Sequence, residues 1–101
     1  MLFHVTATHT TGNCPAYHRE RMPVMVAAME QQGSVANQLG VKVHSMLSGA
    51  PEHVTFMVLE ADSPTSIAQF TSSLPFEQDF KVTPVVPEEE LLAMAKAMMG
   101  N

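Results

Sequence analysis

The chain has 101 residues, of which 46% are hydrophobic, and its formal net charge is −5. This length predicts a single domain over residues 1–101, with a core that is only marginally large for a monomer, so we expect association. The chain has only five Lys and Arg residues. They provide no basic patch for a phosphate backbone, and we expect no nucleic-acid partner.

Membrane insertion and disulfide bonding are also excluded by composition. The first residues lack a cationic stretch, and the longest apolar run, residues 24–29, is far too short to span a bilayer. We therefore expect no membrane partner. A single cysteine excludes an internal disulfide and favours a reducing, cytoplasmic location.

Residues 2–9 alternate as a strand does. One face is apolar and holds Phe3, Val5 and Ala7. The other face is mostly polar and holds Leu2, His4, Thr6 and Thr8.

A helix is expected to follow this first strand. Asn13 is a good N-cap and Pro15 suits a first helical turn, while Pro23 predicts a kink or a fresh start. Beyond it, apolar residues at helical spacing predict a buried, Met-rich stripe: Met22, Met25, Val26 and Met29. Gly33 and Gly40 are the candidate ends of this helix.

The second half of the chain predicts two strands, a helix, a strand and a last helix. Residues 41–47 alternate, and 54–61 form a strongly apolar strand after a turn, which together indicate a β-hairpin. A helix is expected from 62–64 to about 73, with Ile67 and Phe70 buried. Residues 80–86 predict a fourth strand, in which Pro84 indicates an edge position or a strand end. Pro87 opens a final helix with three glutamates in its first turn and an expected buried stripe of Leu91, Met94, Ala95 and Met98.

The element order is β-α-β-β-α-β with a C-terminal helix, which predicts an α+β, ferredoxin-like domain with a four-stranded antiparallel sheet and helices on one face. The opposite face would expose a mostly polar set, which needs a cover. A second copy of the chain is the simplest cover. This predicted face comprises His4, Thr6, Thr8, Lys42, His44 and Met46.

The Phe-rich segment 74–80 and the closing Lys-Val-Thr-Pro-Val-Val of 81–86 resemble the dimeric α/β-barrel superfamily, in particular its small one-domain members. The resemblance implies a homodimer whose two sheets form a barrel with a pocket in each half. The superfamily includes cofactor-free and haem-degrading monooxygenases, muconolactone-isomerase-like enzymes, stress-responsive proteins and ligand-binding regulatory domains. Haem-degrading members typically use a Trp, which this chain lacks. Haem is therefore disfavoured, and no nucleotide cofactor is expected.

The segment after the first strand holds two histidines and the only thiol: His9, Cys14 and His18. A helix start favours the Cys14 thiolate, and a helical offset of four would put His18 on the same face. The three residues predict a site for zinc, copper or iron. Three protein ligands plus water would leave an open, catalytically useful position, whereas a fourth ligand from Glu20, His4 or a partner subunit would close it. Two alternatives stay open. Cys14 and His18 form a metal-free nucleophile or redox-sensitive pair, or the three residues have only structural roles.

The predicted polar sheet face supplies a second set of candidate residues. His4 and His44 are candidate general bases, and with Cys14 they form the expected catalytic set. The expected ligand-binding residues around them are Thr6, Thr8, Tyr17, Lys42 and Met46. His53, beside a turn, is expected to be solvent-exposed.

These observations predict a homodimer that binds a small molecule and acts as an oxygenase or isomerase, with imidazole moving a proton and with or without a transition metal. One alternative is a non-catalytic metal-binding or metal-sensing dimer. Another is a regulatory or interaction domain whose histidines are structural.

Overall fold

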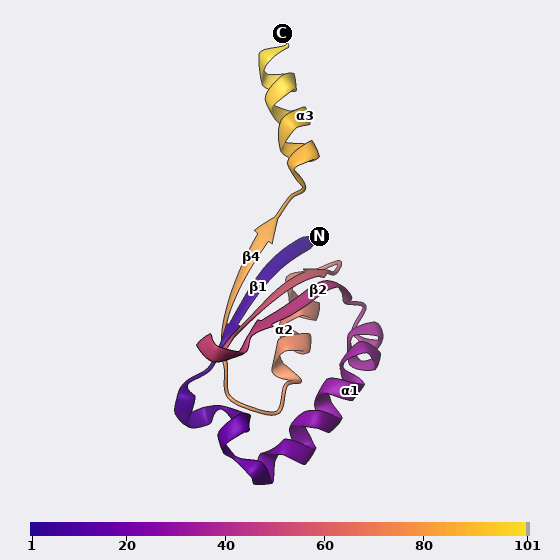
Figure 1. Cartoon of the computed structure of the whole chain (residues 1–101). Coiled ribbons are helices and arrows are strands. Elements are labelled where there is room, and N and C mark those ends of the chain that lie inside the picture. Colours follow the sequence, from indigo (N-terminus) through magenta and orange to yellow (C-terminus); the bar gives the residue numbers. More distant parts are fainter. Residues whose placement is uncertain (101) are drawn as a thin grey trace.

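The computed structural model describes residues 1–100 and contains the expected order of strands and long helices. These elements are β1 (Leu2–Thr8), α1 (Met22–Gln38), β2 (Lys42–Gly49), β3 (Val54–Glu60), α2 (Pro64–Ser72), β4 (Asp79–Val85) and α3 (Glu88–Met99). The strands form one antiparallel sheet in the order β2-β3-β1-β4. Figure 1 shows α1 and α2 beside this sheet. The predicted α+β, ferredoxin-like fold class is confirmed.

The core lies between one face of the sheet and the helices α1 and α2. Alternate residues of β1 point into it, as the sequence pattern predicts, and they meet Met57 and Leu59 of β3. Ile67 and Phe70 of α2 cover them and are 1% and 0% exposed. Full burial of one such side chain contributes about 1.5–3 kcal/mol of transfer free energy.

The expected helix from Asn13 is wrong, because three separate 3-10 turns occupy this segment. They are Thr11–Asn13, Pro15–Tyr17 and Arg19–Arg21. Thr10, rather than Asn13, is the N-cap, and its side-chain oxygen accepts the Asn13 amide at 3.2 Å. The long helix α1 begins only at Met22, so Pro23 marks the fresh start that the sequence predicts.

The Met-rich stripe of α1 is not buried in the core, contrary to expectation. Ala36, near the C-terminal end, is the buried residue of α1, whereas Met29 is 63% exposed. Only the C-terminal half of α1 therefore packs closely on the sheet.

A bulge in β2 changes which side chains face the helices. Val43 pairs with the buried Leu59, but the register then shifts, and Met46 pairs with the buried Met57. His44 is the extra residue. The expectation that Met46 shares a sheet face with His44 is wrong, because a bulge places two consecutive residues opposite one.

Helix α3 extends away from the sheet beyond the end of β4 (Figure 1). All its residues are exposed, including Met98 at 80%. The expected burial of its apolar stripe is therefore not seen within a single chain. None of the helices in residues 1–100 is both long and apolar enough to cross a membrane.

Candidate functional site

Three potential metal ligands from distant parts of the chain meet at one end of the sheet. His9 follows β1, Cys14 lies between two 3-10 turns, and His53 lies in the turn between β2 and β3. Their ligand atoms all lie within 4.8 Å of one another. Two of the three residues predicted as metal ligands, His9 and Cys14, are thus brought together, but His53 takes the place expected for His18.

The strand pairing explains why His53 reaches His9. Thr8 pairs with Val54, so the residue after β1 lies opposite the residue before β3. The His9 amide donates to the His53 carbonyl at 3.2 Å. His53 was expected to be exposed, but it is half-buried. The predicted ferredoxin-like fold already implies that the first and third strands are antiparallel neighbours. This implied pairing could have indicated that His53 lies close to His9.

His53 has a left-handed backbone conformation, with φ of 55°. It is the only residue other than glycine with positive φ in the described part of the chain. Histidine is one of the side chains that tolerate this region better than most. The turn Ala50–Glu52 holds this conformation, because the His53 amide donates to the Ala50 carbonyl.

The two imidazoles are in direct contact. His53 Nδ1 lies 3.2 Å from His9 Nε2, and His53 Nε2 lies 3.4 Å from Thr11 Oγ1. The His9 ring packs edge-on against Phe76, with centroids 5.3 Å apart. Burial, followed by the neighbouring charge of His53, lowers the pKa of His9 below its usual 6.5. A lowered pKa favours the neutral form of the His9 imidazole, which is the form that binds metal ions.

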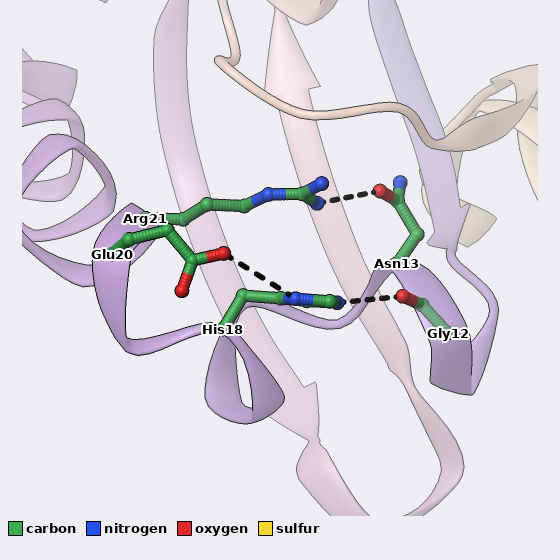
Figure 2. Close-up of polar contacts among 5 residues, drawn as sticks. All are labelled: Gly12, Asn13, His18, Glu20 and Arg21. Atoms are coloured by element: carbon green, nitrogen blue, oxygen red, sulfur yellow. Dashed lines mark hydrogen bonds and ion pairs between the residues drawn. The ribbon is translucent and has the colours of Figure 1, made fainter.

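His18, predicted as a metal ligand, instead makes polar contacts within its own segment. Its Nε2 donates to the Gly12 carbonyl at 2.7 Å, and its Nδ1 lies 3.6 Å from Glu20 Oε1 (Figure 2). Beside it, Arg21 donates to Asn13 Oδ1 at 3.0 Å (Figure 2). The 3-10 turns do not have the α-helical offset that would align His18 with Cys14. His18 instead ties the successive turns together.

A cavity of about 310 Å³ adjoins the three-residue cluster. It lies beneath the N-terminal half of α1, and two residues of the expected stripe, Met25 and Met29, contribute to its wall. Further apolar lining residues include Ala28, Met46, Met57, Leu74 and Phe76. Its polar groups come from Gln32, Ser48, Thr55, Gln78, Tyr17 and the His9–Cys14–His53 cluster. None of the described lining residues is a Lys, Arg, Asp or Glu.

Most of the predicted ligand-binding residues lie away from this cavity. The pairing register puts His4 and Thr6 on the sheet face opposite the core. Five predicted residues are absent from the cavity lining: His4, Thr6, Thr8, Lys42 and His44. Met46, Tyr17 and Cys14 do line it. Met46 reaches the cavity because of the β2 bulge, which no sequence pattern indicated.

His44 pairs with Glu60 on the open face. His44 Nε2 lies 2.7 Å from Glu60 Oε1. The hydrogen bond from His44 is the main reason why the pKa of the Glu60 carboxyl falls below 4.5, with smaller contributions from the charges of His44, Lys42 and the N-terminus.

The His44→Ala substitution is expected to raise the pKa of Glu60, because it removes this hydrogen bond. A depressed carboxyl pKa stabilises the fold above the unfolded pKa, and this stabilisation disappears as the pH falls through the folded pKa. Carbon-detected NMR titration of the Glu60 carboxyl measures the shift, with His4→Ala as the control. An unchanged Glu60 midpoint in His44→Ala would show that the pair does not persist in solution.

Residues 1–99 match the model of a family described as "Domain of unknown function (DUF3303)", and the chain therefore belongs to that family. No significant match was found among curated proteins.

Proposed function

We propose that this member of the DUF3303 family binds a small, predominantly apolar molecule in the cavity beneath α1. The main support is the cavity itself, whose volume of about 310 Å³ is at the lower end of the range for small-molecule sites. Its walls are predominantly apolar, with a smaller number of polar side chains, which is the usual composition of such sites.

The lining also limits the chemistry of the ligand. The absence of Lys, Arg, Asp and Glu from the described lining favours an uncharged body, since a buried charge needs a partner. Four methionines, Met25, Met29, Met46 and Met57, contribute flexible and polarizable walls that adapt to irregular shapes. The His9–Cys14–His53 cluster provides the polar end that orients the ligand.

Filling the cavity is expected to weaken binding. Ala28 lines the cavity, whereas its neighbour Ala27 is exposed and is not among the lining residues. We expect Ala28→Phe to weaken the binding of 1-aminoanthracene, a small apolar fluorophore, by about tenfold or more, equivalent to about 1.4 kcal/mol. Fluorescence titration measures this affinity, since the chain has no Trp to interfere.

Ala27→Phe is the matched control, because it adds the same ring one position along the same helix. The control should bind the fluorophore as the unmodified protein does. Equal affinity of the two variants, or no saturable binding by the unmodified protein, would contradict the proposal.

The oxygenase or isomerase activity expected from the sequence stays a prediction. His9 and His53 are better placed for chemistry on a cavity ligand than His4 and His44, because only the first pair lines the cavity. The alternative of a regulatory domain requires the same ligand binding without turnover.

The proposal includes a homodimer. The open sheet face exposes Leu47 and Phe56, at 69% and 44%, and α3 exposes its whole apolar stripe. In a two-fold symmetric dimer, α3 of each copy would cover the open sheet face of the other copy.

A further inference from the structure

We infer that His9, Cys14 and His53 form a binding site for one transition-metal ion, with zinc as the favoured metal, and that its open coordination position faces the apolar cavity. This inference adds a metal to the polar end of the proposed ligand site, and the two ideas are tested separately below.

The spacing of the donor atoms suits a tetrahedral ion. Zinc–nitrogen distances of about 2.0–2.1 Å place two tetrahedral nitrogen ligands about 3.3 Å apart. His9 Nε2 and His53 Nδ1 lie 3.2 Å apart. The ion would replace the hydrogen atom that these two nitrogens share, and the Cys14 sulfur, within 4.8 Å of both, needs only a small side-chain movement to complete three ligands.

The backbone holds the ligands in place before any metal binds. The hydrogen bond between the His9 amide and the His53 carbonyl joins two of the ligand-bearing segments. Thr11 Oγ1 lies 3.4 Å from Nε2 of His53. With Nδ1 bound to a metal, Nε2 would carry the proton and donate to this hydroxyl oxygen, as metal-bound imidazoles donate to their outer partners. The His53 ring packs edge-on against the His9 ring, with centroids 5.0 Å apart, so the two imidazoles are already adjacent.

Cys14 provides the third donor. It is only 9% exposed, and no hydrogen bond of its sulfur occurs among residues 1–100. One thiolate and two imidazoles form a borderline-soft set, which suits zinc and is unsuited to magnesium or calcium. Three protein ligands leave the fourth position of a tetrahedral ion open.

The charge of the site indicates which head group a cavity ligand carries. A divalent ion with one thiolate and two neutral imidazoles keeps one positive charge. The remaining described lining residues contribute no carboxylate to balance it. An anionic group that coordinates metal, attached to an apolar body, therefore fits the open position and the cavity together.

Cobalt(II) titration of untagged, metal-free protein tests the site. We expect one equivalent to bind with the visible bands of four-coordinate cobalt and a near-ultraviolet thiolate-to-cobalt band, which zinc then abolishes by displacement. Because the chain has a single cysteine, the thiolate band reports on Cys14 alone.

Three variants make the test specific. Cys14→Ser should lose the thiolate band, and His53→Asn should weaken cobalt binding by at least about tenfold, a loss typical of damaged metal sites. Asparagine is chosen because it tolerates the left-handed backbone. His18→Ala is the matched control and should bind cobalt as the unmodified protein does, with circular dichroism establishing that each metal-free variant is folded.

Absence of the thiolate band in the unmodified protein, or an equal effect of His53→Asn and His18→Ala, would overturn the metal site. Should His53→Asn not fold, His9→Gln takes its place with the same expectation. Octanohydroxamate, a metal-binding head on an apolar chain, should bind the zinc-loaded protein at least about tenfold more tightly than the metal-free protein. Equal binding would overturn the open position.

The result is separable from that of the cavity proposal. Fluorophore binding that Ala28→Phe blocks, without cobalt binding, retains the cavity and removes the metal. Cobalt binding without saturable fluorophore binding retains the metal site and removes the cavity proposal.

Discussion

Phe70→Ala is expected to destabilise the protein by about 3–5 kcal/mol, because it leaves a large cavity at the centre of a small core. Phe70 is 0% exposed and packs in the core cluster with Phe3, Leu59 and Ile67. Domains of this kind have unfolding free energies of about 5–15 kcal/mol, so the loss is a large part of the total. Urea unfolding followed by circular dichroism, at one protein concentration, measures it.

Gln69→Ala is the control on the same helix. Gln69 is exposed, and its truncation should change the free energy of unfolding by less than about 0.5 kcal/mol. A loss below about 1.5 kcal/mol for Phe70→Ala would contradict the described core, since it would mean that neighbouring side chains fill the space.

The double substitution Leu91→Glu with Met98→Glu is expected to convert a dimer into single chains of 11.0 kDa. Both residues lie on the exposed apolar side of α3, and two carboxylates there would oppose burial against a second copy. A 12-residue helix is marginal in water by itself, and in the proposed dimer a partner surface would stabilise α3. Size-exclusion chromatography with light scattering measures the mass.

Glu89→Gln with Lys96→Gln is the matched control, because both side chains lie on the opposite side of α3. This variant should retain the mass of the unmodified protein. The dimer proposal is contradicted if the unmodified chain is already monomeric at micromolar concentration. The contribution of α3 is contradicted if both double variants stay dimeric.

The fold was largely predictable because its signals are local. Alternation in residues 2–9, the Pro64 helix start and the acidic first turn of the last helix each lie within a few neighbouring residues, and the elements they predicted are present. The element order then identified the ferredoxin-like arrangement. The helix expected after Asn13 was wrong because 3-10 turns occupy residues up to Arg21, and α1 begins only at Met22, next to Pro23.

The candidate site was only partly predictable. His9 and Cys14 were identified because they are close in sequence and belong to residue types that bind metals. His53 was assigned to a solvent-exposed turn, since a turn by itself does not indicate what lies opposite. His4 and His44, around which the sequence predicted a pocket, lie on the other side of the sheet from the cavity.

The sequence by itself determined the fold class, the apolar core positions of the first strand and helix α2, and the importance of the segment that carries His9 and Cys14. These depend on periodicity and residue chemistry within one segment. Tertiary structure decided that His53 completes the cluster, that Met46 faces the cavity, and that Met25 and Met29 of α1 line the cavity instead of packing in the core. Those outcomes depend on strand register, on one extra residue in β2 and on how far α1 stands from the sheet, which are set by contacts between distant segments.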